Sequence, residues 1–186
     1  MRHTLILTLL STTLFLAACG GNGGQPQPDP DPNPQPTPVG TPVGSPVSKV
    51  IGVAGGSLAS VDGKITLEIP AGALTKDETV SIQEITNNAP GKFGKAFRLS
   101  PEGTTFAKPA RITFTFTEEQ LKGAPFEAMQ VGYQKDGYWK AIKVVARDPA
   151  ARTVTVETTH FSDWSPVPGA QLDPSMAHVK ESGTVT

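Results

Sequence analysis

Proline stands at every second position from Pro26 to Pro38, and it returns at Pro42 and Pro46. Proline fixes φ, lacks a backbone N–H and pushes the preceding residue toward extended geometry, so such a segment cannot build a packed core. It favours a semi-rigid polyproline II spacer of about 3.1 Å per residue. Residues 19–47 are therefore predicted to form a disordered, Gly- and Pro-rich stalk, and any compact fold must come from the chain that follows.

The first 18 residues have the organisation of an export signal. A short basic start precedes an uncharged apolar run over residues 4–15, TLILTLLSTTLF. A run of this length is too short to cross a bilayer as a helix, but it suits the hydrophobic region of a signal peptide. Residues 1–18 are therefore predicted to be a signal peptide.

The end of this segment, Leu16-Ala17-Ala18-Cys19, resembles the lipobox of bacterial lipoproteins. The resemblance implies that the thiol of Cys19 is acylated, that the signal is cut before it, and that the new N-terminus receives a further chain such as palmitate. Each buried methylene contributes about 0.8 kcal/mol, so two or more chains hold a protein firmly at a membrane. The alternative is an ordinary signal with an incidental cysteine.

The lipobox leads us to expect a lipoprotein of the cell envelope, attached to the membrane by the lipid on Cys19. The outer membrane or the cell surface is the preferred location, because Gly20 stands where some inner-membrane lipoproteins carry a retaining aspartate. Cys19 is the only cysteine in the chain, so the exported domain must be stable without an internal disulfide. The proline run is expected to hold that domain away from the lipid; the alternative is a ligand for a proline-recognition module.

Residues 48–168 are the predicted folded domain, and residues 169–186 a polar C-terminal tail. Period-two alternation with β-branched and aromatic residues, the signature of strands, recurs along the domain. It is found in KITLEI (64–69), TVSIQEI (79–85), ARITFTFT (110–117) and RTVTVETT (152–159). Asp-Gly pairs at 62–63 and 136–137 predict hairpins. TEEQLKG (117–123) is the one helical candidate, with Thr117 as N-cap. The predicted fold is an all-β, antiparallel sandwich.

Four segments of this domain together resemble the ZU5 domain, a β-sandwich of ankyrins and netrin receptors that has bacterial relatives on many exported proteins. They are GGSLASVDGKITLEIPAGAL (55–74), SPEGTTFAKPARITFTF (100–116), DGYWKAI (136–142) and THFSDWS (159–165). A sandwich supports many unrelated functions, so the fold alone names no activity. Because the animal ZU5 domains mostly bind partners, the resemblance implies a non-catalytic binding or structural module, with no cofactor and with an unknown envelope protein or polymer as its partner.

The sequence His160-Phe161-Ser162 suggests an alternative. One death-domain member of the ZU5 group cleaves itself at a His-Phe-Ser sequence, between the aromatic residue and the serine. Here Ser162 Oγ would attack the Phe161 carbonyl, His160 would take the hydroxyl proton, and water would hydrolyse the resulting ester. The competing interpretation, which we favour, is that Phe161 packs in the core while Ser162 and Asp163 make local backbone hydrogen bonds at a bend.

Few other residues suggest chemistry. The three histidines are His3, His160 and His178, which argues against a histidine-rich zinc site, and no metal is expected. Tyr133, Tyr138 and Trp139 are candidates for binding a sugar or a protein, although cross-strand packing is the commoner use of such residues. No spacing singles out two carboxylates for polysaccharide hydrolysis. The chain has 16 basic and 17 acidic residues and a net charge of -1, with no basic cluster, so nucleic acid is not an expected partner.

Overall fold

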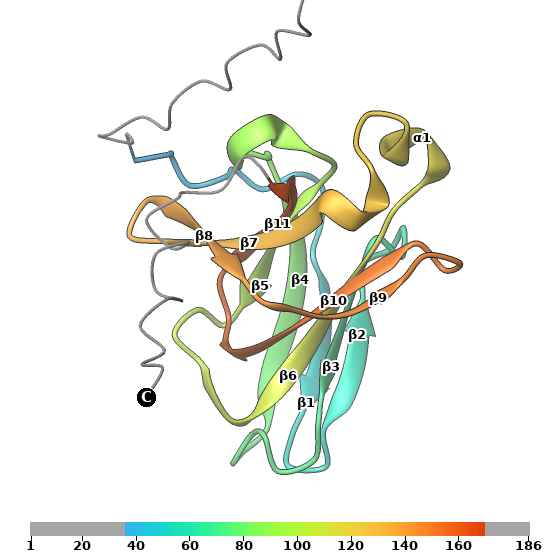
Figure 1. Cartoon of the computed structure of the whole chain (residues 1–186). Coiled ribbons are helices and arrows are strands. Elements are labelled where there is room, and N and C mark those ends of the chain that lie inside the picture. Colours follow the sequence, from blue (N-terminus) through green and yellow to red (C-terminus); the bar gives the residue numbers. More distant parts are fainter. Residues whose placement is uncertain (1–35, 170–186) are drawn as a thin grey trace, which may run out of the picture.

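The computed structural model describes residues 36–169, which form two antiparallel β-sheets packed against each other (Figure 1). The six-stranded sheet has the order β1-β4-β5-β11-β7-β8, and the five-stranded sheet the order β2-β3-β6-β10-β9. The strands of the first sheet are β1 (Val47–Ile51), β4 (Glu78–Ile85), β5 (Ala96–Ser100), β7 (Met129–Lys135), β8 (Tyr138–Ile142) and β11 (Asp163–Pro168). Those of the second are β2 (Gly56–Ala59), β3 (Ile65–Ile69), β6 (Thr105–Thr115), β9 (Val144–Asp148) and β10 (Thr153–His160). The predicted all-β sandwich is confirmed.

The alternating segments of the sequence became strands because each can bury one face. In β3, Ile65 and Leu67 are fully buried between the sheets, while Thr66 and Glu68 lie on the outer face. The predicted hairpins also form: residues 60–64 join β2 to β3, and Asp136-Gly137 joins β7 to β8. Both residues of the second turn have positive φ, 55° and 81°, as a two-residue turn of this type requires.

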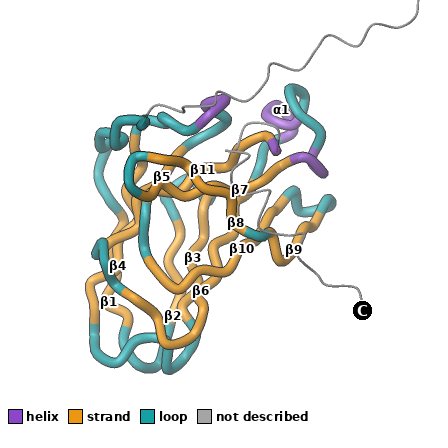
Figure 2. Tube along the Cα trace, turned by 60° about the vertical axis from the view of Figure 1, so that its left-hand side comes forward, coloured by secondary structure: helices purple, strands orange, loops and turns teal. Residues whose placement is uncertain are grey.

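Short helical segments gather at the upper end of the sandwich, shown in purple in Figure 2. They are η1 (Pro90–Lys92), α1 (Glu118–Leu121) and η2 (Phe126–Ala128). The predicted N-cap of α1 is present: the hydroxyl of Thr117 accepts from the backbone N–H of Gln120, whose side chain accepts from the N–H of Thr117. This reciprocal arrangement satisfies two backbone donors that a helix start otherwise leaves free.

Strand β11 carries prolines although it lies between β5 and β7. Its pairing with β5 covers only Asp163 and Trp164, whereas its pairing with β7 continues to Pro168. From Ser165 onward β11 therefore has a strand partner on one side only. Proline is tolerated where no ladder hydrogen bond is needed, so Pro166 and Pro168 can belong to this strand.

Residues 37–46, which we call the strap, lie on the domain, although they were predicted to belong to the disordered stalk. The N–H of Val43 donates to Glu84 O at 2.8 Å, and the N–H of Thr86 donates to Thr41 O at 2.8 Å, beside β4. At the other end, the N–H of Thr37 donates to Gly137 O at 2.7 Å. The strict proline alternation ends at Pro38, and the threonines and valines that follow supply the N–H groups that prolines lack.

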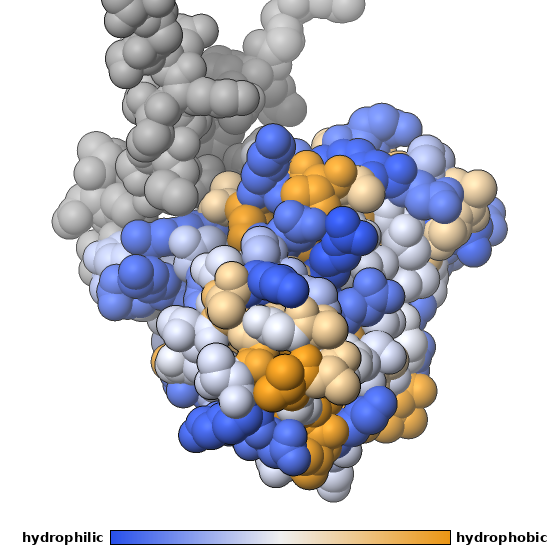
Figure 3. All heavy atoms as spheres, turned by 90° about the horizontal axis from the view of Figure 1, so that it is seen from below, coloured by the Kyte–Doolittle hydropathy of each residue, from blue (hydrophilic) through white to orange (hydrophobic). Residues whose placement is uncertain are grey.

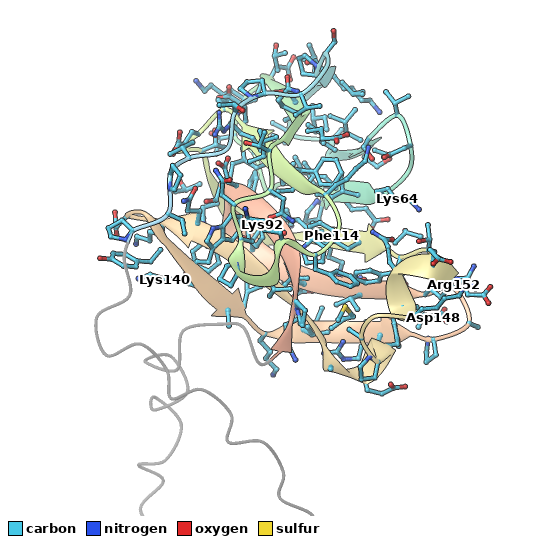
Figure 4. All side chains as sticks on the ribbon, turned by 90° about the horizontal axis from the view of Figure 1, so that it is seen from above. Lys64, Lys92, Phe114, Lys140, Asp148 and Arg152 are labelled. Carbon is cyan, nitrogen blue, oxygen red and sulfur yellow. The ribbon has the colours of Figure 1, made fainter. Side chains whose placement is uncertain are left out.

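The core lies between the two sheets and contains most of the large apolar side chains of residues 36–169. Viewed from above, Phe114 lies in the interior, whereas the charged residues Asp148 and Arg152 lie at the periphery (Figure 4). The lower face shows exposed apolar atoms among hydrophilic ones (Figure 3). Val50 of β1 and Val53 of the following turn are among the exposed apolar residues. The closed, apolar interior leaves the loops at the edges of the sandwich as places for a site.

Candidate functional site

Three connections that are far apart in the sequence surround one cleft of about 540 Å³. They are the β5–β6 loop, the β7–β8 turn and the β10–β11 connection, all on the left of the molecule in Figure 1. The residues used below are Arg98, Glu102, Tyr133, Lys135, Asp136, His160, Phe161, Ser162 and Asp163. Ligand pockets in proteins measure about 300–1,000 Å³, so the cleft has the size of a small-molecule or side-chain binding site.

The cleft contains the His-Phe-Ser segment singled out in the sequence. Strand β10 ends at His160 and β11 begins at Asp163, so Phe161 and Ser162 carry the chain from one sheet to the other. Phe161 is 3% exposed, and its ring packs edge-on against Phe106 at a centroid distance of 4.8 Å. Phe161 is therefore a core residue, as the packing interpretation predicts.

The hydroxyl of Ser162 is hydrogen-bonded to strand β7. It donates to the carbonyl oxygen of Gln134 at 2.5 Å, and the Ser162 carbonyl accepts from the N–H of Leu99 at 3.0 Å. Contrary to the sequence interpretation, these bonds are long-range and not local. They attach the β10–β11 connection to β5 and to β7, so Ser162 serves here as a structural donor.

The imidazole of His160 has a different neighbour. Its Nδ1 lies 3.3 Å from the hydroxyl oxygen of Thr158, and its backbone N–H donates to the same oxygen at 3.2 Å. No hydrogen bond joins His160 to Ser162 among residues 36–169. A general base must lie within about 2.6–3.2 Å of the proton it removes, or reach it through one water. His160 is bonded to Thr158 and Ser162 to Gln134, so the two are not arranged as a general base and its nucleophile.

His160 also completes a cluster of three aromatic rings that joins the sheets. Its ring centroid lies 5.0 Å from that of Tyr133 and 5.8 Å from that of Trp164, and the latter two are 5.4 Å apart. Burial lowers the pKa of His160 below its usual range, and the positive charge of Lys135 lowers it further. The imidazole is therefore neutral at pH 7 and packs as an aromatic side chain with a polar edge.

A partly buried ion pair lies beside this cluster. Arg98 Nε is 2.7 Å from Asp163 Oδ1, and its Nη2 is 2.8 Å from Oδ2. Nη2 also donates to the carbonyl of Gly40 in the strap at 3.1 Å. The hydrogen bonds with Asp163 raise the pKa of Arg98 despite its burial, and the charges of Asp163 and Glu102 act in the same direction. This two-point pairing ties β5, β11 and the strap together at the cleft wall.

Of the three aromatic ligand candidates, only Tyr133 belongs to the cleft. Trp139 is 4% exposed and packs with Ala89 and Val167 in a separate small cluster, so its ring offers no surface to a ligand. Tyr138 is half-buried beside it on β8, opposite Lys135. The cross-strand packing considered for these residues is what the structure shows for Trp139.

Arg98, Gln134 and the strap belong to the site but were not predicted from the sequence. Arg98 stands between Phe97 and Leu99 in an alternating run, where an outward polar residue is the ordinary expectation. Its partner Asp163 is 65 residues away. The nearest acidic residue in the sequence is Glu102, four residues after Arg98, so nothing local pointed to the pairing with Asp163.

Residues 36–169 hold no group of three His, Cys, Asp or Glu side chains that is placed to bind a metal ion. In the same range, no helix is both long and apolar enough to cross a membrane. Cys19, the predicted signal peptide, most of the predicted stalk and nearly all of the C-terminal tail lie outside the described residues. Neither the family models nor the curated proteins that were searched include a match to this chain.

Proposed function

We propose that this protein is a membrane-anchored envelope lipoprotein that presents a ZU5-like β-sandwich as a non-catalytic binding module. The observation that carries the proposal is the cleft of about 540 Å³, which the β5–β6, β7–β8 and β10–β11 connections surround. Loops on a rigid scaffold are the usual location of binding sites in sandwiches. The partner is an envelope protein or polymer.

The interactions in the cleft suit binding better than chemistry. The Ser162 hydroxyl, the only nucleophile of the His-Phe-Ser segment, donates to a backbone carbonyl. The Arg98–Asp163 pair holds the wall in one geometry, because two parallel charge-assisted hydrogen bonds fix the orientation of both side chains. A preorganised wall reduces the entropy lost when a ligand binds.

The anchor part of the proposal depends on Cys19 and the lipobox that precedes it. Acyl chains on this thiol attach the domain to lipid, and the proline-rich segment between residues 19 and 36 gives it reach. We expect the wild-type protein to sediment with membranes and Cys19→Ser to be released from them. Membrane association that is unchanged in Cys19→Ser would contradict the lipid anchor. It would leave the proposal of a binding module unaffected.

The binding part is tested by a photo-crosslinking amino acid placed in the full chain in intact cells. One variant carries it at Lys135, an exposed residue of the cleft, and a matched control carries it at Glu127, an exposed residue of η2. We expect a discrete adduct from position 135 and none from 127. Adducts from both positions, or from neither, would overturn the assignment of the cleft.

Self-cleavage between Phe161 and Ser162 is the alternative, favoured by one observation: His160, Phe161 and Ser162 all line the same cleft. Intact-mass measurement of the denatured protein separates the two functions. The binding module predicts one uncut mass, identical in behaviour to that of Ser162→Ala. Two fragments that meet at Ser162 and disappear in the Ser162→Ala variant would establish the alternative.

A further inference from the structure

The cleft places charges of both signs close together. Glu102, Asp136 and Asp163 contribute three carboxylates, and Arg98 and Lys135 contribute two cationic groups. His160 adds no charge at neutral pH because its burial and Lys135 lower its pKa. Arg98 and Asp163 neutralise each other, which leaves Glu102 and Asp136 together with Lys135, so a charged ligand of either sign meets a like charge in the cleft, and like-charge contacts are costly in recognition. The balance favours a ligand without net charge.

Several polar groups of the cleft have hydrogen-bonding capacity left over. Arg98 uses Nε and Nη2 for Asp163 and Gly40, which leaves the two N–H groups of Nη1 without a partner in the described part of the chain. The hydroxyl of Tyr133 and the ammonium of Lys135 likewise have no hydrogen-bond partner within residues 36–169. The carboxylates of Glu102 and Asp136 supply acceptors at the rim. The cleft therefore offers both donors and acceptors to a ligand.

An aromatic surface lies between these polar groups. Tyr133 and His160 both line the cleft, with ring centroids 5.0 Å apart, and the buried ring of Trp164 supports them from the core side. Packing of the three rings limits their movement, so the surface is formed before a ligand arrives. Tyr133 and His160 meet edge-on, with ring planes 70° apart, so the cleft offers an angled apolar surface together with donors and acceptors, which suits a molecule that has both C–H and hydroxyl groups.

We propose that the cleft binds a neutral saccharide, a short uncharged segment of an extracellular polymer. A sugar ring presents C–H groups to Tyr133 and His160, and each of its hydroxyls both donates and accepts, which matches the mixed polar rim. The inference deepens the proposed binding module and rests on it. It goes further by selecting a polymer of uncharged sugars over a protein partner.

The test uses the purified full chain and three probes of neutral sugar: cello-, malto- and chito-oligosaccharides. Binding is followed by saturation-transfer NMR and by tryptophan fluorescence, since Trp164 packs directly beneath the cleft rings. We expect saturable binding of at least one probe, with an affinity that changes less than about twofold between low and high salt, because screening acts on charged ligands. Polygalacturonate and polylysine serve as the anionic and cationic comparisons.

Two variants locate the binding. Glu102→Trp fills the rim and removes an acceptor, and a loss of about tenfold in affinity is expected. Tyr133→Phe removes a hydroxyl but keeps the ring, and a smaller loss of a few-fold is expected. Glu127→Trp, on exposed η2, is the matched control and should bind as the wild type does. Unchanged melting temperatures show that the variants are folded.

Failure of this inference differs from failure of the proposed function. If none of the three probes binds, or if a charged polymer binds instead with strong salt dependence, the saccharide proposal is overturned. Should the crosslinker at position 135 then still give a discrete protein adduct, the binding module stands with a protein partner. Loss of both signals would overturn both proposals.

Discussion

Two groups of charged residues in this molecule have similar contacts but different surroundings. At the cleft, Arg98 and Asp163 are joined by two hydrogen bonds, with side chains 25% and 8% exposed. Immediately before β5, Lys95 Nζ lies 2.8 Å from Asp62 Oδ2 in the β2–β3 turn and 2.6 Å from Glu84 Oε2 of β4. These three side chains are between 30% and 43% exposed. We call the second group the Lys95 cluster.

In this molecule burial, and not distance, decides how much a charged contact contributes to stability. Breaking a buried pair leaves an uncompensated charge away from water, which costs about 3–5 kcal/mol. An exposed pair loses little when broken, because water replaces the partner, and its value is about 0–1 kcal/mol. The Arg98–Asp163 pair therefore stabilises the cleft wall, whereas the Lys95 cluster contributes little to the free energy of unfolding.

Asp163→Ala should lower the free energy of unfolding by about 3 kcal/mol, because Arg98 is left without its partner in the cleft wall. Urea denaturation of the full chain measures the loss. The matched control is Glu157→Ala, which breaks the exposed pair between Arg111 Nε and Glu157 Oε1 at 3.1 Å, and it should cost less than about 1 kcal/mol. Equal losses in the two variants would remove the distinction between buried and exposed pairs.

The same contrast explains how far the sequence could predict this structure. Alternation of apolar and polar residues is a local pattern, and it located β3, β4, β6 and β10 correctly. The Asp-Gly turns and the Thr117 cap are also local, because their conformation is set within four residues. Strand β11 was harder, since Pro166 and Pro168 argue against a strand until its one-sided pairing with β7 is known.

The site was predictable only in part, for the same reason. The motif residues His160, Phe161 and Ser162 were found because they are adjacent in the chain, and the burial of Phe161 was expected. Their partners were not: Gln134 is 28 residues from Ser162, and Arg98 is 65 residues from Asp163. Such pairings follow from strand order, which period-two patterns do not specify. The docking of the strap belongs to the same class of long-range contacts.

Ser162→Ala should lower the free energy of unfolding by about 1–2 kcal/mol, because the Gln134 carbonyl loses its donor in a partly buried position. Urea denaturation again measures the change. Ser48→Ala, at an exposed position of β1, is the control and should be neutral within about 0.5 kcal/mol. A neutral Ser162→Ala variant would mean that the hydroxyl is not a structural donor and would reopen its role as a nucleophile.

His160 makes the cleft sensitive to pH in a range where the Lys95 cluster is not. Burial and Lys135 lower its folded-state pKa below the ordinary value of 6.5, so protonation opposes folding. Its contribution to stability is complete above pH 6.5 and falls as the pH drops toward the folded-state pKa, since the unfolded chain then binds more protons. His160→Gln should flatten this decline between about pH 7 and pH 5. A decline of unchanged slope would assign the effect to other groups.

The smallest effect is expected at the Lys95 cluster. Burial raises the pKa of Asp62, but hydrogen bonds from Lys95, Ser60 and the Lys64 N–H outweigh it and lower the pKa from 3.8 to about 2. This contribution is complete above pH 3.8 and is lost as the pH falls toward 2, because protonation of the carboxylate removes its attraction to Lys95. Solvent screens the exposed cluster, so Asp62→Asn should cost only a few tenths of a kcal/mol at pH 7 and less in high salt. Urea denaturation at pH 7 and pH 3 measures the cost of Asp62→Asn and its dependence on pH. A loss of stability as large as that of Asp163→Ala would show that exposure does not distinguish the two groups of charges.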